Sequence, residues 1–338
     1  MFDQPLFFKP LMFERVWGGN HLDALHGKPI PPGKIIGESW ELSDRPDAQS
    51  IVDGGEFDGW TLRQLLEKYP REMLGKLPDR ARFPLLVKYV DAGDKLSVQV
   101  HPDDEGAKKF NDLGKSECWV VVHAEPGAQI VRGLKPGTTR EDFAHAVEEN
   151  RVEELLHYFE PKAGDVIALP PGTVHAIGAG LVVAEVQQNS DVTLRIYDYN
   201  RMGLDGKPRA LHVKEALDAI RFDGRSDEFT GDMHSETVKP TRLHPCCELL
   251  LNGRYFDLVR LTLSAESMVA QVDANQKQYR HLEIETKGRT TVVMVLEGQG
   301  VICGRVVKPG MTGLIPAHMT HAQFVPLDNL TLLLAMPK

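Results

Sequence analysis

The chain has 338 residues, a formal net charge of −9, 42% apolar side chains and 26% charged side chains. This composition is typical of a globular protein, and the negative charge argues against nucleic acid as the main partner, because a polyanion is bound by a basic face. The length allows two domains or one elaborated domain.

The sequence carries no pattern that directs it to a membrane or out of the cell. The opening stretch MFDQPLFFKP has neither the positive region nor the long apolar region of a secretory signal. No segment reaches the roughly 18 apolar residues of a membrane span. The four cysteines lack C-x-x-C spacing and the density of a disulfide scaffold. We therefore expect a soluble, cytoplasmic protein.

The first half of the chain is predicted to be strands interrupted by helices. Short strands open it, and GESWELS at 37–43 alternates polar and apolar residues as a strand does. Thr61 and Thr139 stand where helix caps are expected, the latter three residues before an aspartate. The remaining runs, LLVKYV, SVQV, CWVVVHA, DVIALP and LVVAEVQQ, are rich in branched residues. We place the helical insertions at about 61–80, 139–159 and 211–220.

Four side chains with nitrogen or oxygen ligand atoms stand in this strand-rich region. Gln99 and His101 are two residues apart and therefore point to the same face of a strand. Glu117 begins an apolar run, where an unpartnered carboxylate is costly, and His175 follows the turn PPGT. Two histidines, one glutamate and one glutamine suit Zn²⁺ or another borderline divalent ion. We predict that the four meet around one metal ion.

An internal repeat indicates a second, similar unit. Gly164, Pro170 and His175 recur at identical spacing as Gly310, Pro316 and His321, with His318 where Gly172 stood. The counterpart of Glu117 is Thr291, and no Q-x-H precedes it. The second unit is therefore predicted to keep the scaffold without the metal site. The other histidines lack ligand-like spacing, and we expect them on the surface or in loops: His21, His26, His123, His145, His157, His212, His244 and His281.

These spacings resemble the cupin motifs, G-x5-H-x-H followed by a glutamate, and G-x5-P-x-G-x2-H. The chain has Gly93, five residues and then Gln99 and His101 for the first, and Gly164 to His175 for the second. The glutamine departs from general cupins and matches the type I mannose-6-phosphate isomerases, whose motif is S-x-Q-x-H-P. Other marks of that family are WGG at 17–19, GESWELS at 37–43, FPLLVKYVDA at 83–92, GKSECW at 114–119 and VQQNSDVTLRIYDYNR at 186–201.

The resemblance covers residues 17 to past 200, is weaker in the C-terminal unit, and is to the compact bacterial form. It implies a mainly β fold with two cupin-like antiparallel barrels or sandwiches and a few helices packed on the N-terminal one. We predict a catalytic domain at 1–222, a polar linker at 223–240 and a second cupin-like domain at 241–338 without a metal site.

The resemblance also implies a zinc-dependent aldose-ketose isomerase that interconverts mannose 6-phosphate and fructose 6-phosphate through an enediolate. One Zn²⁺ per chain would be held by the four predicted ligands, Gln99, His101, Glu117 and His175. Arg195 would be a catalytic residue and Lys115 an active-site lysine. The partner is a phosphorylated hexose.

The remaining roles are less defined by the pattern. Arg195 alternates with apolar neighbours and should point into the barrel, where its planar fork suits a phosphate. Ser97 and Lys88 are candidates for substrate binding, although a serine without ligand contact fits the strand nearly as well. Either Glu185 or Lys115 could be the base. Alternative functions are isomerisation of another aldose or sugar phosphate, a metal-binding sugar sensor without turnover, and an iron-dependent cupin oxygenase.

Overall fold

The fold is that of a computed structural model, which describes residues 2–338 except 79–81, 224–235, 266–270, 273–277 and 280. It is mainly β and its strands pair in antiparallel sheets, as the sequence predicts. The described residues contain no helix that is long and apolar enough to cross a bilayer.

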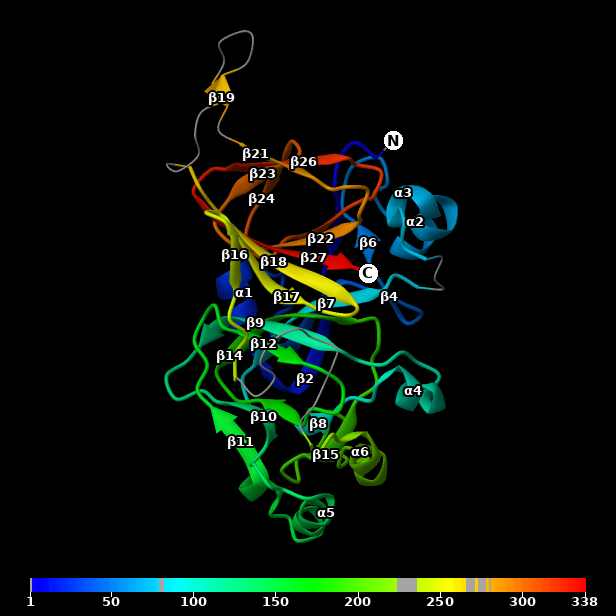
Figure 1. Ribbon diagram of the computed structural model, residues 1–338, viewed down its shortest axis with the longest axis vertical. Coiled ribbons are helices and arrows are strands. Elements are labelled where there is room, and N and C mark those ends of the chain that lie inside the picture. The colour runs from blue at the N-terminus through cyan, green and yellow to red at the C-terminus, as the bar shows by residue number, and fades with distance from the viewer. Residues whose placement is uncertain (1, 79–81, 224–235, 266–270, 273–277, 280) are drawn as a thin grey trace.

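The N-terminal barrel, in the lower half of Figure 1, consists of two facing sheets. The first has six strands in the order β12-β9-β14-β7-β2-β3, and the second has five in the order β11-β10-β13-β8-β15. The strands of the first sheet are β2 (Leu11–Gly19), β3 (Ile36–Leu42), β7 (Leu85–Ala92), β9 (Glu117–Ala124), β12 (Val166–Leu169) and β14 (Leu181–Gln188). Those of the second are β8 (Val98–Val100), β10 (Ile130–Leu134), β11 (Leu156–Phe159), β13 (His175–Ile177) and β15 (Leu194–Tyr197). Beside them lies the hairpin β4 (Asp44–Arg45) and β5 (Ala48–Gln49).

Successive side chains on each strand point alternately into the barrel and away from it. On β9, Trp119 and Val121 point inward and pack with Ile130 and Ile177 of the opposite sheet. Cys118 and its neighbours two residues away point outward into a different core. The six-stranded sheet is therefore buried on both faces, which explains why its strands are almost continuously apolar.

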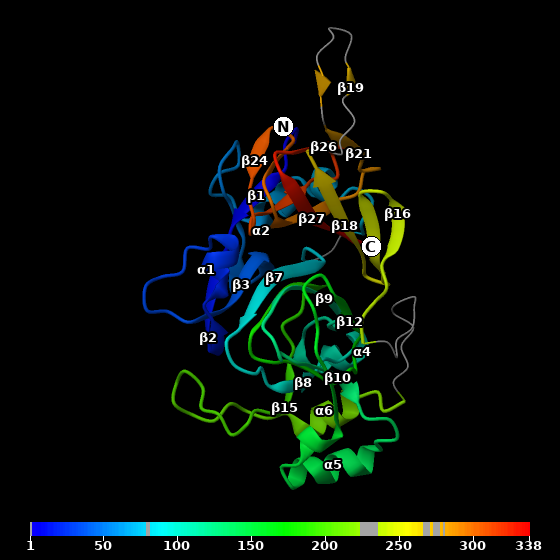
Figure 2. The same cartoon turned by 90° about the vertical axis from the view of Figure 1, so that its left-hand side faces the viewer.

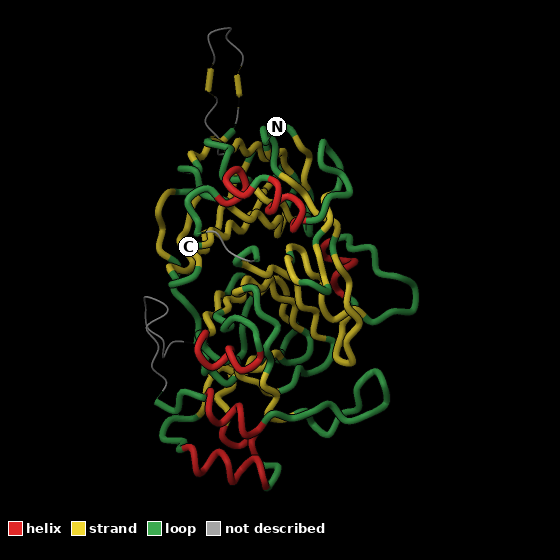
Figure 3. Tube along the Cα trace, turned by 90° about the vertical axis from the view of Figure 1, so that its right-hand side faces the viewer, coloured by secondary structure: helices red, strands yellow, loops and turns green. Residues whose placement is uncertain are grey.

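The helices divide between the two units, as Figure 3 shows in red. The helices α5 and α6 cover the outer face of the five-stranded sheet, where Phe143 and Ala216 pack on Val98 and Val100. The helices α2 and α3 instead lie beside the C-terminal unit, where the amide of His318 donates to the carbonyl of Glu72. The α-helices are α1 (His21–His26), α2 (Leu62–Lys68), α3 (Pro70–Leu74), α4 (Asp104–Ala107), α5 (Arg140–Glu148) and α6 (Val213–Ala219), and the 3-10 helices are η1 (Lys108–Phe110) and η2 (Val152–Leu155).

Two expectations about helices have different outcomes. Thr61 and Thr139 both cap their helices through capping boxes, as predicted. The predicted helix to residue 159 is wrong after α5, because η2 is followed by strand β11, which pairs with β10. The pairing buries Leu156 and Phe159, and this tertiary contact outweighs the weak helical pattern of the segment.

The C-terminal unit is a second pair of sheets with strands borrowed from the start of the chain. In Figure 2, β1 lies among its strands, and Leu6 pairs with Leu314. The large sheet contains β1 (Leu6–Lys9), β6 (Ile51–Val52), β16 (Thr241–His244), β17 (Cys247–Asn252), β18 (Phe256–Ser264), β22 (Thr291–Glu297), β25 (Thr312–Ile315) and β27 (Asn329–Pro337). The small sheet contains β21 (Leu282–Glu285), β23 (Gly300–Ile302), β24 (Arg305–Val307) and β26 (His321–Pro326), and a separate pair is β19 (Gln271–Val272) and β20 (Gln278–Tyr279).

The division at 1–222, 223–240 and 241–338 stays a prediction, because strand pairing crosses it at β1 and residues 224–235 of the linker lie outside the described residues. The two copies of the repeat each contain two strands that follow one another along the chain, β12 and β13 in the first unit and β25 and β26 in the second. His321 is exposed whereas His175 is buried. Within the described ranges, the groups of three metal-ligating side chains include none from the second unit.

The outer face of the six-stranded sheet and the C-terminal unit share one hydrophobic core, in which Phe256 is fully buried. We expect Phe256→Ala to lower the free energy of unfolding by about 3–5 kcal/mol, because truncating a buried phenylalanine leaves a cavity. Urea titration followed by circular dichroism measures this. The matched control is Val306→Ala, at a side chain that is 61% exposed, which should stay within about 0.5 kcal/mol of the parent. An equally small loss for Phe256→Ala would contradict a shared core.

His26 makes the stability depend on pH at the same junction. It is buried against the ring of Tyr89, and its two ring nitrogens have no hydrogen-bond partner among the described residues. Burial, followed by the nearby Lys28, lowers its pKa from 6.5 to about 4. Between pH 6.5 and about 4, His26 is therefore protonated in the unfolded protein and neutral in the folded protein. Because the unfolded state binds more protons, stability falls as pH falls through this window, by at most about 1.4 kcal/mol per pH unit. In His26→Phe this contribution should be lost, so stability should fall less steeply as pH falls, while the contributions of His101 and His175 remain. Urea titrations of both proteins from pH 7 to 4.5 compare the slopes, and parallel slopes would contradict the assignment.

Candidate active site

Four side chains converge at one end of the N-terminal barrel, and we call Gln99, His101, Glu117 and His175 the ligand set. Register places Gln99 of β8 opposite His175 of β13, and His101 follows β8 directly. Glu117 comes from the facing sheet as the first residue of β9. Its two carboxylate oxygens lie 3.4 Å from His175 Nε2 and 3.6 Å from His101 Nε2. The predicted convergence of these residues is therefore present, and their role as metal ligands stays a prediction.

Each histidine of the ligand set is oriented by a backbone carbonyl. Nδ1 of His101 lies 2.8 Å from the carbonyl oxygen of Val192, and Nδ1 of His175 lies 2.9 Å from that of Thr173. Since a carbonyl only accepts, both Nδ1 atoms carry the proton and donate it. The lone pair of each Nε2 then points into the barrel, which is how metal-binding histidines are usually held.

The ligand set is buried and short of partners. Among the described residues, His101 Nε2 and both carboxylate oxygens of Glu117 are buried without a hydrogen bond, although Lys115 Nζ forms an ion pair with Glu117 Oε2 at 3.2 Å. Burial lowers the pKa of His101 well below its ordinary value and the pKa of His175 to about 4, so both rings are neutral at pH 7. Neutral imidazoles, a carboxylate and separations of 3.4–3.6 Å fit a tetrahedral cation whose ligands lie at about 2.0–2.2 Å.

Gln99 completes the set with an amide that can present either of its ends. Its Nε2 lies 3.3 Å from His175 Nε2, and its oxygen accepts from Ser97 Oγ at 3.4 Å. A half-turn about the last side-chain bond exchanges the two ends and directs the oxygen toward the other ligand atoms. Ser97 thus contacts a member of the ligand set, and its predicted contact with substrate stays a prediction.

A chain of buried charges adjoins the ligand set. Lys115 Nζ lies 3.2 Å from Glu117 Oε2 and 3.8 Å from Glu185 Oε1, and Lys88 Nζ lies 3.2 Å from Glu185 Oε1. Burial raises the pKa of Glu185, and Lys88 and Lys115 only partly offset this. Such a carboxyl group has a pKa moved toward neutrality, which is a property expected of a general base.

Arg195 comes from β15, where register places it opposite Gln99. Its Nη1 donates to the carbonyl of Ala210 at 2.9 Å, and its Nε is buried without a hydrogen bond to any described residue. The structure therefore brings Arg195 beside Gln99 of the ligand set.

The sequence reasoning missed Glu38 and Trp40, which belong to the same charge chain. Trp40 Nε1 donates to Glu38 Oε2 at 2.8 Å, and Lys88 Nζ lies 6.0 Å from the centre of the Trp40 ring. Burial acts to raise the pKa of Glu38, but Lys88 and then Arg15 outweigh it and lower that pKa to about 2. The signal was available in GESWELS, where Glu38 and Trp40 are two residues apart on one strand face.

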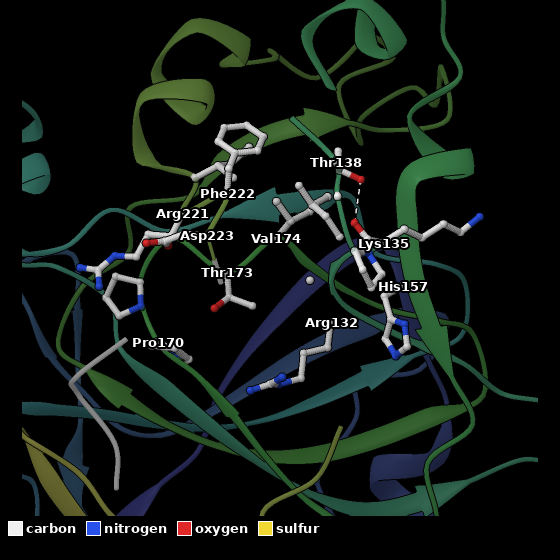
Figure 4. A pocket seen from close by; sticks show the side chains of 17 residues that line it. Arg132, Lys135, Thr138, His157, Pro170, Thr173, Val174, Arg221, Phe222 and Asp223 are labelled. Carbon is white, nitrogen blue, oxygen red and sulfur yellow. Dashed lines mark hydrogen bonds between the residues drawn. The ribbon is translucent and has the colours of Figure 1, made fainter. Parts of the chain in front are cut away.

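A cavity of about 410 Å³ is lined by Thr173 and Val174, which directly precede His175 of the ligand set (Figure 4). Arg132, which is opposite His175 in the β10–β13 register, and Thr173, whose carbonyl orients His175, both line it. Lys135 and His157 give it further positive or titratable groups. The sequence reasoning did not identify this cavity, because its walls come from four separated segments.

Comparisons with known proteins show which family the chain belongs to. Residues 6–116 match the family described as phosphomannose isomerase type I, catalytic domain. Mannose-6-phosphate isomerase ManA of Bacillus subtilis is 37% identical over 316 residues, covering 93% of this chain and 92% of that protein. Mannose-6-phosphate isomerase of Streptococcus mutans is 39% identical over 218 residues, covering 64% of this chain and 68% of that protein.

Solved structures give the same result for the fold. The crystal structure of the mannose 6-phosphate isomerase from Bacillus subtilis has a TM-score of 0.83 at 28% identity, covering 98% of this chain and 99% of that one. A mannose 6-phosphate isomerase bound with zinc and yttrium has a TM-score of 0.74 at 17% identity, covering 99% of this chain and 100% of that one, and shares the fold. Together with the full-length similarity in sequence, these matches mean that the chain belongs to the type I mannose-6-phosphate isomerase family of enzymes.

Proposed function

We propose that this chain is a zinc-dependent isomerase that interconverts mannose 6-phosphate and fructose 6-phosphate through an enediolate. The observation that carries the proposal is the ligand set, in which the two Nε2 atoms lie within 3.6 Å of the Glu117 carboxylate, inside a member of this family. Gln99, His101, Glu117 and His175 would hold one Zn²⁺ per chain. When bound, the cation supplies Lewis-acid polarisation of the sugar carbonyl and so favours removal of the neighbouring proton.

The cationic side chains would bind and orient the sugar phosphate. Arg195 Nε makes no hydrogen bond to the described residues, and the planar guanidinium can hold a phosphate or two adjacent sugar oxygens. Lys88 and Lys115 are buried beside the ligand set, where they can neutralise negative charge on the substrate. Ser97 offers a hydroxyl on the same strand face as Gln99. Binding of the phosphate, which is remote from the reacting carbons, would hold C1 and C2 in the orientation that the reaction needs.

Isomerisation moves one proton between C2 and C1, so one group must remove it and return it. Glu185 and Lys115 are the two candidates, and they lie 3.8 Å apart. The raised pKa of Glu185 favours it as the base, with Lys115 then holding the charge that develops on oxygen. Trp119, whose ring edge packs on His175 at 5.5 Å between centroids, helps exclude water from this end of the barrel.

Chelation followed by zinc addition tests the proposal. Removing metal should lower conversion of mannose 6-phosphate to fructose 6-phosphate by at least about a hundredfold, and zinc should restore it. Bound metal is counted in the same samples, and exchange of the C2 proton in deuterated water is followed by NMR. Tight binding of the sugar phosphate without exchange would identify a sensor, and consumption of oxygen would identify an oxygenase.

Isomerisation of another aldose or sugar phosphate is the alternative within enzymes. A substrate panel separates the two, because a phosphate held by Arg195 should make phosphorylated hexoses far better substrates than free ones. Comparable rates for free mannose would contradict the proposed substrate.

A further inference from the structure

A second group of potential ligands lies in the N-terminal barrel, away from the ligand set. We call His21, His123 and Glu125 the distal cluster. His123 is opposite Val182 of β14, whereas Glu117 is opposite Gln187 of the same strand. Five positions along a strand correspond to about 17 Å, so the two groups lie at opposite ends of the barrel. The ligand atoms of the distal cluster all lie within 4.8 Å of one another.

Asp91 fixes the orientation of His21. This fully buried carboxylate on β7 lies 3.0 Å from His21 Nδ1 and accepts from the backbone amides of His21 at 2.6 Å and Leu22 at 3.2 Å. Nδ1 of His21 must therefore carry the proton, and Nε2 points away from Asp91 toward Glu125. A carboxylate–imidazole pair of this kind is the usual support of a histidine that binds a metal through its other nitrogen. Gly19 is required for it, because a Cβ there would meet the Asp91 carboxylate at 1.9 Å.

A β-bulge directs His123 to the same place. The β9–β14 register shifts between the pairs His123–Val182 and Val121–Val183, which leaves Val122 as the extra residue. Without the bulge, His123 would share the inward face of Val121. With it, the ring packs on His21 at 5.1 Å between centroids. In the described part of the chain His123 makes no hydrogen bond or ion pair, so its nitrogens are available.

Glu125 supplies a carboxylate at an open edge. Its Oε1 lies 3.3 Å from His21 Nε2, which is about the separation of two ligands on a tetrahedral zinc ion. Gly180 makes room for it, since a Cβ at that position would meet Glu125 Oε2 at 2.8 Å. His21 and Glu125 also line a surface cavity of about 480 Å³, which leaves space for water at a fourth position.

We propose that the distal cluster is a second binding site for a divalent cation of the zinc class, which ties α1 to β7, β9 and the turn at 125–128. A protonated His21 bridging Asp91 and Glu125 would account for two of the contacts. It would, however, leave the His123 ring next to a positively charged His21 ring, at 5.1 Å between centroids, without giving the His123 nitrogens a role. Coordination uses all three side chains and the orientation that Asp91 imposes. The site does not depend on the proposed reaction.

Zinc binding to the intact chain tests the proposal. Zinc is titrated against a chromophoric indicator, and bound metal is counted by atomic spectroscopy, for the parent, Glu117→Gln, His123→Ala and Glu125→Ala. The parent should bind two zinc ions per chain and each variant one, with the affinity of the lost site lowered by at least about a hundredfold. His123→Ala and Glu125→Ala should keep the isomerase turnover of the parent. The control His157→Ala removes an exposed histidine that pairs with Glu236 at 3.1 Å and belongs to no group of three ligands in the described part of the chain, and it should still bind two.

Glu117→Gln provides a background in which the distal cluster is measured alone. Zinc should raise the unfolding temperature of this variant, and adding Glu125→Ala should abolish that rise while the unfolding temperature without zinc stays the same. The proposal is overturned if His123→Ala and Glu125→Ala bind as much zinc as the parent, or if zinc stabilises the Glu117→Gln protein equally with and without Glu125. If the protein fails the isomerase assay, the number of zinc ions bound by the parent and by the variants is not affected, so the two proposals fail separately.

Discussion

Glu117→Gln should lower turnover of mannose 6-phosphate by at least about a thousandfold, equivalent to about 4 kcal/mol of transition-state stabilisation, and should remove zinc from the ligand set. Glu117 is the member that reaches both histidines, at 3.4 and 3.6 Å, and the carboxylate is the anionic ligand among them. A neutral amide of the same shape is a much weaker ligand. Bound zinc and turnover are measured on the same preparation.

The same substitution also tests the charge chain. Lys115 loses the carboxylate at 3.2 Å and keeps only Glu185 at 3.8 Å, so the variant should be less stable as well as inactive. Circular dichroism therefore accompanies the kinetics, and Glu236→Gln, at an exposed glutamate, serves as the matched control. Near-parental turnover in a folded Glu117→Gln protein would contradict the ligand assignment.

Arg195→Ala and Glu185→Gln should each lower kcat by about 10²–10⁴-fold while the ligand set keeps its zinc, which separates these residues from Glu117. Glu185 is expected to act on the proton, so its loss should change kcat with little effect on KM. Arg195 is expected to hold the phosphate, so its loss should raise KM as well. Steady-state kinetics and metal counts on both variants measure this.

The pH profile adds a second readout for Glu185. Because burial raises its pKa, kcat/KM should rise with pH through a value above that of an ordinary carboxyl group, as the base loses its proton. In Glu185→Gln this acid limb should disappear. If it persists, Lys115 or another group is the base, and if both variants keep near-parental rates, neither residue has the proposed role.

The ligand set could be predicted from sequence because its pattern is local. Gln99 and His101 share a strand face by alternation, and a histidine after PPGT has no packing reason to be there. Glu117 stands out as a carboxylate at the start of an apolar strand. Family resemblance then joined these signals across 76 residues of chain, from Gln99 to His175.

Other contacts could not be predicted because they depend on pairing between distant strands. The Lys88–Glu185 pair arises from the β7–β14 register, and the position of His123 from a bulge that no residue type announces. His21 was expected on the surface or in a loop, yet a buried aspartate seventy residues away orients it. Strand β11 was mistaken for helix because its pairing with β10 decides its structure.

Strand β1 has a consequence for how this chain is made. Leu6 leaves the ribosome long before its neighbour Leu314. At about 5–20 residues per second, the nascent strand waits about 15–60 seconds for that neighbour. Throughout this delay the apolar residues of β1 and the outward face of the six-stranded sheet lack the packing partners that they have in the folded protein. Strand β1 can therefore complete its pairing only after residue 314 has emerged, and until then the growing polypeptide is a natural client for chaperones.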